Sequence, residues 1–118
     1  MDRPICFIDL ETTGVHIEQD RIVEISVLKL NKDWKGKVVK TMLINPGIPI
    51  PKAASDIHGI TDEMVKDKPT FVQISKSLLS LIGNCDIAGY HSNRFDIPFL
   101  DTNFHRVGLI WDWKGVNL

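Results

Sequence analysis

The sequence has no excess of either charge and no long apolar run, and it contains only two cysteines. Its 118 residues carry 14 Lys and Arg against 15 Asp and Glu, a formal net charge of −1. This balance gives no indication of a broadly basic surface that would bind nucleic acid. No apolar run reaches the roughly 20 residues that cross a bilayer, and the N-terminus lacks the apolar stretch of a signal peptide. We therefore expect a cytoplasmic protein that does not associate with membranes.

The two cysteines, Cys6 and Cys85, lie far apart in the chain and lack the short spacing of a metal site. We interpret them as reduced thiols in the core of a cytoplasmic protein. The sequence is 43% hydrophobic and 25% charged, which is typical of a globular domain. With no repeat or low-complexity segment, the chain is expected to form one domain over residues 1–118.

Hydrophobic patterning predicts a meander of three strands first. Residues 5–9 show little alternation, which predicts a central strand buried on both faces. Residues 21–30 and 38–44 predict the next two strands, with a hairpin turn at 31–37 between them. Residues 45–51 contain three prolines and predict an extended connection.

The rest of the chain predicts mainly helices. A short turn at 55–59 precedes a short helix whose N-cap is Thr61. A capping box of Thr70 and Gln73 starts the next helix, and Gly83 stops it. The last expected elements are a short strand at 86–90, a helix at 93–107 with Asn93 as its N-cap, and an irregular segment at 111–118. This order predicts an α/β fold, with the antiparallel meander and one parallel strand in a mixed sheet flanked by helices.

Two acids one residue apart, Asp9 and Glu11, follow the first apolar run. The two-residue period of a strand points both carboxylates the same way and directs Leu10 into the core. Two carboxylates 4 Å apart repel by roughly 4 kcal/mol in a partly screened setting, so a divalent cation such as Mg²⁺ is a fitting partner. The alternative is a pair of solvated acids at a strand end. A third acid, Asp96, begins a helix after a short strand, where it also favours the helix dipole.

Three segments together carry a resemblance to a known family. They are "FIDLETTG", "IHGITDEMV" and "HSNRFDIPFL", in that order along the chain. The first and the last of them resemble the first two signature motifs of the DEDD 3′→5′ exonuclease superfamily, and "IHGITDEMV" resembles the segment that follows the third strand in epsilon-like members. This superfamily has an RNase H-like fold and includes the DNA polymerase III epsilon subunit, RNase T and oligoribonuclease. The "HGIT" segment favours the histidine-type branch.

The resemblance implies roles for individual residues. Asp9, Glu11 and Asp96 match three of the four family acids, which hold two divalent cations, Mg²⁺ or Mn²⁺. Thr12, Thr13 and Gly14 match the pocket of the terminal nucleotide, and His58 and Ile60 match residues near it. The implied reaction releases nucleoside 5′-monophosphates from the 3′ end of single-stranded DNA or RNA, with a polymerase subunit as an implied partner.

Two departures from the family pattern affect these expectations. His91 is followed by Ser92 where the family often has Asn, and we interpret His91 as a structural histidine that is not a general base. The family's third motif, which carries the fourth acid and a general base, has no match after Asp96. We therefore expect an exonuclease domain that is incomplete at its C-terminal side and weak or inactive by itself. The alternative is a remnant that binds nucleic acid or protein, or dimerises through the incomplete side.

Five lysines gather around the expected hairpin: Lys29, Lys32, Lys35, Lys37 and Lys40. Lysines on an edge strand commonly prevent strand pairing between molecules. A contact with a nucleic-acid backbone is the alternative interpretation.

Overall fold

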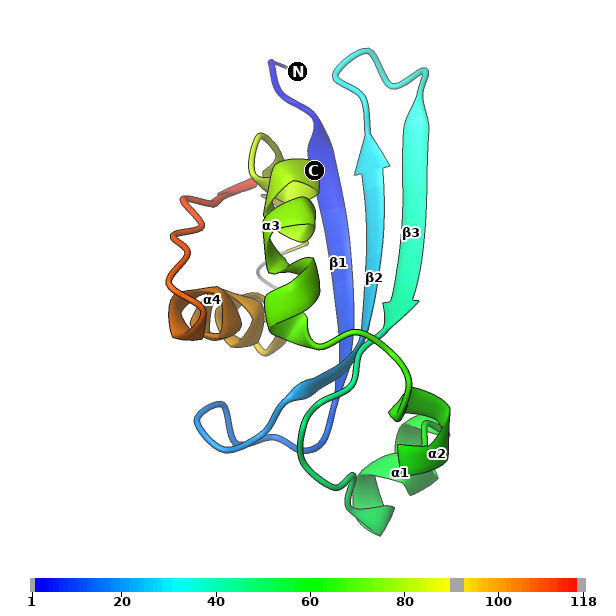
Figure 1. Ribbon diagram of the computed structural model, residues 1–118. Coiled ribbons are helices and arrows are strands. Elements are labelled where there is room, and N and C mark those ends of the chain that lie inside the picture. Colours follow the sequence, from blue (N-terminus) through cyan, green and yellow to red (C-terminus); the bar gives the residue numbers. More distant parts are fainter. Residues whose placement is uncertain (1, 90–92, 117–118) are drawn as a thin grey trace.

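A mixed five-stranded sheet and the helices packed against it make up the computed structural model, which describes residues 2–89 and 93–116 (Figure 1). The strands are β1 (Ile5–Thr12), β2 (Ile22–Leu30), β3 (Lys37–Leu43), β4 (Asp86–Ala88) and β5 (Lys114–Val116). The helices are α1 (Lys52–His58), α2 (Asp62–Val65), α3 (Phe71–Ile82) and α4 (Asp96–Arg106). None of these helices is both long enough and apolar enough to cross a membrane.

The strands lie in the order β3-β2-β1-β4-β5. β1 pairs with β2 and β2 with β3 in antiparallel fashion, whereas β4 runs parallel to both β1 and β5. The predicted α/β fold with a mixed sheet is therefore confirmed. The irregular segment expected at 111–118 is wrong for residues 114–116, which form β5. Three residues are too few to show a periodic pattern, and this strand is defined by its pairing with β4.

One face of the sheet is covered and the other is open along β1. Cys6, Ile8 and Leu10 are buried beneath α3 and α4, while Phe7 is 38% exposed and Asp9 is also exposed. β1 is central, as predicted, but the expectation of burial on both faces is wrong. The alternation was hidden in the sequence because an apolar residue, Phe7, occupies the open face.

Two hydrophobic clusters hold the described residues together. The larger one joins β1, β2 and β4 to α3 and α4, and its largest side chains include Phe99 and Phe104. Trp111 is buried in it and packs edge-on against Phe104, so this residue is part of the core. The smaller cluster lies under α1 and α2 and consists of Val23, Ile50, Ala54, Ile60 and Val65.

The start of α3 agrees with the sequence prediction, whereas the starts of α1 and α4 differ from it. The capping box of Thr70 and Gln73 opens α3 as predicted, and the Gln73 Oε1 accepts the Thr70 N–H at 2.9 Å. α1 is longer than the turn expected at 55–59, because it already begins after Pro51. α4 begins three residues later than expected, at Asp96, and Asn93 caps it through its side chain from outside the helix.

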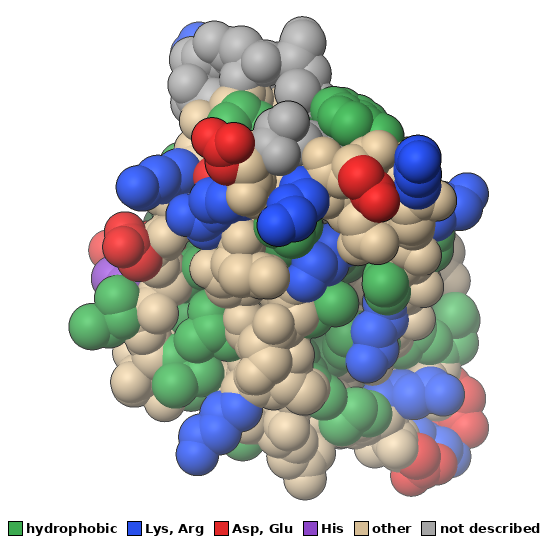
Figure 2. All heavy atoms as spheres, turned by 90° about the horizontal axis from the view of Figure 1, so that it is seen from above, with side chains coloured by type: hydrophobic (Ala, Val, Ile, Leu, Met, Phe, Trp, Pro, Cys, Tyr) green, Lys and Arg blue, Asp and Glu red, His purple; other side chains and the backbone are tan. Residues whose placement is uncertain are grey.

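Lysines gather at the end of the molecule that carries the β2–β3 hairpin, where Figure 2 shows several Lys and Arg side chains on the surface. Lys32, Lys35 and Lys37 are exposed there, and β3 forms one edge of the sheet. This placement agrees with protection of a sheet edge. The alternative, a contact with a nucleic-acid backbone, stays a prediction.

Candidate active site

Of the three acids that the sequence singled out, Asp96 is the one that is buried. It is 8% exposed at the start of α4, and its Oδ2 accepts the backbone N–H of Leu10 at 3.0 Å. β4 pairs with β1 only at Ile5 and Cys6, so further along this edge β1 has no partner strand among the described residues. The first turn of α4 therefore bonds to β1 between the two acids that the sequence singled out, Asp9 and Glu11.

Asn93 fixes this junction from the loop before α4. Its Nδ2 donates to the Ile8 carbonyl at 2.9 Å and to the Asp96 Oδ2 at 3.2 Å. Its Oδ1 accepts the Asp96 N–H at 3.0 Å. One amide side chain thus ties the strand, the helix start and the buried carboxylate together. His91, also singled out in the sequence, lies outside the described residues.

Burial and neighbouring carboxylates raise the pKa values of Asp96 and Glu11. Burial raises the pKa of Asp96 and the neighbouring Asp9 adds to this, although hydrogen bonds from Leu10 and Asn93 oppose it. Burial also raises the pKa of Glu11, whereas His58 lowers it. The neighbouring carboxylates Asp9, Glu24 and Asp96 raise it further. The fold therefore concentrates negative charge here, which a bound cation would relieve.

Glu24 is a member of this group that sequence reasoning missed. It lies directly opposite Glu11 in the β1–β2 pairing, where two like charges are destabilising. The register of the two strands brings the pair together. From the sequence alone, Glu24 is only a polar residue within the strand predicted at 21–30.

Carboxylate oxygens are the donors that Mg²⁺ and Mn²⁺ prefer, so Asp9, Glu11 and Asp96 fit such a cation chemically. In the arrangement described for residues 2–89 and 93–116, no three His, Cys, Asp or Glu side chains are close enough together to hold a metal ion. The structure thus brings the three acids into one electrostatic group. It does not assemble them into a coordination sphere.

A cavity of about 600 Å³ opens beside these acids. Its lining combines the first acid motif, the following loop, α1 and the start of α4: Leu10, Glu11, Thr12, Thr13, Gly14, Val15, His16, Asp20, Pro51, Ala53, Ala54, Ile57, His58, Phe95 and Asp96. Most of the predicted nucleotide-pocket residues therefore line one cavity. Asp9 instead faces a groove on the open sheet face, beside Ser26 and Thr41, and Ile60 is 4% exposed in the smaller core cluster.

The loop after β1 is fixed by its own hydrogen bonds. The Thr13 hydroxyl donates to the Asp20 Oδ1 at 2.8 Å and accepts the Arg21 N–H at 3.0 Å, and the Thr13 N–H donates to the Arg21 carbonyl. The Asp20 Oδ2 accepts the His16 N–H at 2.8 Å. The Thr13 N–H is therefore bonded within the loop and does not face the acids. Asp20 shapes the cavity wall, and sequence reasoning missed it because its partners are set by the fold of the loop.

His58 joins α1 to the end of β1. Its Nε2 lies 3.0 Å from the Thr12 carbonyl, and its Nδ1 accepts the Ile60 N–H at 3.0 Å. A carbonyl only accepts, so the proton resides on Nε2 and both nitrogens are engaged. His58 is thus arranged to position the cavity wall, with neither nitrogen left to serve as a base.

Two apolar side chains flank this wall. Ile57, next to His58, is 86% exposed, and Phe95 is 38% exposed with its ring centroid 5.1 Å from that of Phe99. Phe95 thus packs against Phe99 and also lines the cavity. A flat ligand that enters the cavity would meet both residues.

Comparison with known proteins decides the family. The exonuclease family RNase T matches residues 6–111. The chain belongs to this family. RNase T family relatives of known name include the DNA polymerase III subunit epsilon of Haemophilus influenzae, 34% identical over 108 residues, which cover 86% of this chain and 41% of that protein. The PolC-type DNA polymerase III of Listeria innocua is 32% identical over 110 residues, which cover 92% of this chain and 7% of that protein. The chain thus spans less than half the length of these relatives.

Solved structures agree on the fold. E. coli exonuclease I in complex with a 5cy-dA13 oligonucleotide aligns with a TM-score of 0.79 at 22% identity, over 98% of this chain and 27% of that one. Another exonuclease I structure aligns with a TM-score of 0.81 at 21% identity, over 99% of this chain and 28% of that one. The chain therefore has the RNase H-like exonuclease fold that the sequence motifs implied.

Proposed function

We propose that this chain forms part of a metal-dependent 3′→5′ exonuclease that releases nucleoside 5′-monophosphates from single-stranded DNA or RNA. The observation that carries the proposal is the bond between Asp96 and the Leu10 N–H, because it brings the third acid of the family motif to the strand that bears the first two. Membership of the RNase T exonuclease family and the cavity beside these acids support it.

Asp9, Glu11 and Asp96 are the residues that would hold Mg²⁺ or Mn²⁺. When bound, such cations would supply Lewis-acid chemistry, with activation of a water and stabilisation of the leaving oxygen in phosphodiester cleavage. The chain's own part is to orient the substrate. Thr12, Thr13 and Gly14 would bound the 3′-terminal nucleotide on one side, and His58 holds α1 against the strand on the other.

We further propose that residues 1–118 hold an incomplete catalytic site. Three of the four acids of the family pattern are present, and both nitrogens of His58 are committed to backbone partners. Removing one of a set of catalytic groups typically costs orders of magnitude in rate. We therefore expect weak metal binding and little nucleotide release from this chain alone.

Metal binding is the property to test first. Titration with Mn²⁺, followed by electron paramagnetic resonance, should show weak binding to the chain and a further loss in Asp9→Asn and Asp96→Asn. Asp67→Asn serves as the control, because Asp67 is exposed and lies outside the candidate site. Equal binding by all four proteins would contradict the assignment of the acids.

Nucleotide release is measured separately, from a 3′-labelled single strand with Mn²⁺. Little release by the chain and none by its Asp9→Ala variant is the expected result. Release by a longer chain that supplies the remaining motif would complete the case. Robust release by the 118 residues alone would refute the incomplete site, and the substrate classes DNA and RNA are compared in the same assay.

A second candidate is a module that binds nucleic acid or protein without catalysis, or that dimerises. The open sheet face favours it, since Phe7, Leu28 and Val39 lie in register across three strands and Val39 is exposed. Light scattering discriminates between the two. A mass that rises with concentration supports association through this face, and a monomeric mass at all concentrations argues against it.

A further inference from the structure

Two arginines from distant parts of the chain converge outside the candidate site. The Arg106 Nη2, in the last turn of α4, donates to the carbonyls of Ile17 and Glu18 at 2.8 and 2.7 Å. The Arg21 Nη1, just before β2, donates to the carbonyls of Glu18 and Asp20 at 3.4 and 3.0 Å. Both guanidinium groups therefore reach the same Glu18 carbonyl.

Among the described residues, no carboxylate forms an ion pair with either arginine. Within residues 2–89 and 93–116, neither guanidinium lies within salt-bridge distance of a carboxylate. Burial lowers the pKa of Arg106 and the neighbouring Arg21 lowers it further, while the Glu18 carboxylate opposes both. Two adjacent cations of this kind favour an anion between them.

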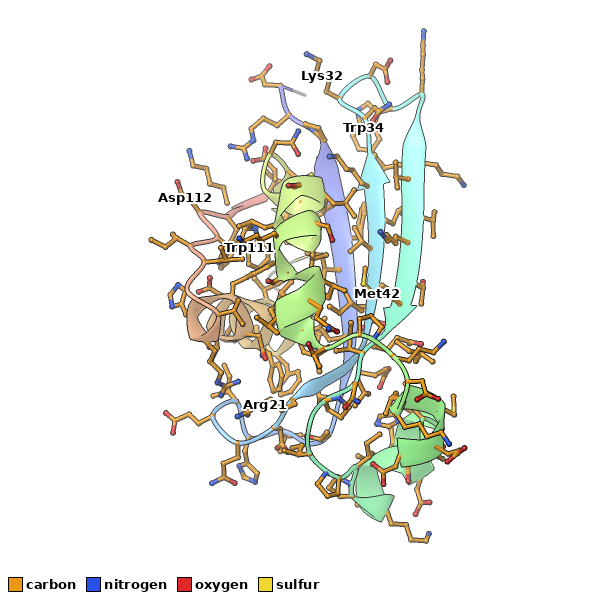
Figure 3. The ribbon with its side chains drawn as sticks, in the orientation of Figure 1. Arg21, Lys32, Trp34, Met42, Trp111 and Asp112 are labelled. Atoms are coloured by element: carbon orange, nitrogen blue, oxygen red, sulfur yellow. The ribbon has the colours of Figure 1, made fainter. Side chains whose placement is uncertain are left out.

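The pair lines a pocket of about 260 Å³ that is separate from the candidate site (Figure 3 labels Arg21). Asn45, Thr70 and Asn103 also line it, but their side chains are bonded to the backbone. A guanidinium group carries five N–H donors. The hydrogen bonds described above use only the Nη2 of Arg106 and the Nη1 of Arg21. The remaining donors of the two guanidinium forks are the groups that an anion would meet.

The loop after β1 separates this pocket from the candidate site. Thr13, Gly14 and Asp20 of this loop line the candidate cavity, and Arg21, the next residue, lines the arginine pocket. We propose that Arg21 and Arg106 bind a backbone phosphate of the single strand whose 3′ end occupies the candidate site. The proposal rests on the proposed function for its ligand, and arginine forks match the geometry of phosphate oxygens.

Binding of an oligonucleotide without metal tests this proposal independently of catalysis. The probe is a single-stranded dT12, titrated against the chain in EDTA and followed by intrinsic tryptophan fluorescence or calorimetry at several salt concentrations. Arg21→Gln and Arg106→Gln should each weaken binding about fivefold and reduce the slope of log K against log salt by about 0.7. Lys76→Gln, which removes an exposed charge on α3, is the matched control and should bind as the unmodified chain does.

Glu18→Gln separates anion binding from loop structure. The arginines bond to the Glu18 backbone carbonyl, so this substitution leaves their hydrogen bonds in place and removes only the opposing carboxylate. It should tighten dT12 binding about twofold, which loss of loop structure would not do. Inorganic phosphate is titrated in parallel by NMR, to distinguish an isolated anion site from one that takes a nucleic-acid backbone.

Each outcome decides the proposal. Weaker binding in both arginine variants, with tighter binding in Glu18→Gln, supports it. Unchanged dT12 binding in the arginine variants, or binding of phosphate but not of dT12, overturns it. Because the measurement uses no metal and no cleavage, it is decided separately from the proposed function, which fails if the three acids do not bind Mn²⁺.

Discussion

At the residue scale, Asn93 is the side chain on which the candidate site most depends. It contacts the Ile8 carbonyl, the Asp96 carboxylate and the Asp96 N–H with a single amide group. A buried polar group that loses its partner costs more than the bond itself contributed. A neutral side chain thus holds the acid Asp96 in place at the site.

Asn93→Ala should therefore destabilise the fold by about 1–3 kcal/mol, because the strand carbonyl and the helix start lose their partner together. Chemical denaturation monitored by tryptophan fluorescence measures the change. Gln19→Ala, which removes an exposed amide side chain, should change the free energy of unfolding by less than about 0.5 kcal/mol. Equal effects from the two substitutions would contradict the anchoring role.

Glu11 gives a pH dependence whose sign follows from its raised pKa. The folded state favours the protonated carboxyl, so this stabilisation is present at low pH. It is lost as the pH rises from the unfolded value of about 4.3 through the higher folded-state pKa. In metal-free buffer, Glu11→Gln should raise the melting temperature at pH 7 by about 1–2 °C and change it little at pH 4, since screening limits the effect.

Thermal unfolding of the variant and the unmodified chain from pH 4 to pH 8 checks this sign. A Glu11→Gln variant that is less stable at pH 7 would show that the carboxylate is favourably paired without metal. Glu63→Gln is the control, because Glu63 is exposed and forms an ion pair with Lys66 on the surface.

At the element scale, α1 matters because it carries His58 to the cavity and stops directly after it. Gly59 follows with φ of 76°, a left-handed conformation, and its N–H donates to the Ser55 carbonyl at 2.8 Å. A Cβ at this position would meet no atom within 4 Å. The requirement for glycine here is therefore conformational and does not come from close packing.

Gly59→Ala should destabilise the fold by about 1–2 kcal/mol through this left-handed conformation. Gly59→Asn should lose less, because asparagine tolerates left-handed geometry better than alanine. Denaturant melts of the three proteins make the comparison. Alanine as stable as glycine would mean that the helix end relaxes to another conformation.

The elements that the sequence predicted well are those with local signals. The alternation of β2 and the capping box of α3 are readable from neighbouring residues, and both are confirmed. The fold family and the grouping of Glu11, Thr12 and Asp96 followed from motifs. β5, Glu24 and Asp20 were missed because a strand pairing, a strand register and a loop conformation define their roles, and none of these is a pattern of adjacent residues.

At the scale of the whole molecule, the two hydrophobic clusters differ in size. The larger one buries aromatic side chains between the sheet, α3 and α4, whereas the one under α1 and α2 contains five small or aliphatic residues. Regions with few buried apolar contacts open at lower free energy than the main core. One wall of the candidate cavity is thus built on the less stable part of the molecule.

Hydrogen exchange should reveal this difference. Amides of α1 and α2 are expected to exchange at least about tenfold faster than those of β1 and β2, since they are released by local opening. Mass spectrometry of peptic peptides, or NMR, resolves the segments. Uniform protection would instead indicate that the two clusters open as one unit.

The position of β1 between β2 and β4 also has a kinetic consequence. β1 meets β2 after a short stretch of chain, but the bonds from Asn93 and Asp96 to Ile8 and Leu10 join residues 85 and 86 positions apart. Closing such long loops is slow, so we expect the meander to form early and α4 to dock late. Stopped-flow refolding should then show Trp111, which packs on α4, reaching its native fluorescence after the backbone signal of the sheet. During synthesis, the first two acids would therefore lack the third until the segment that forms α4 has been made.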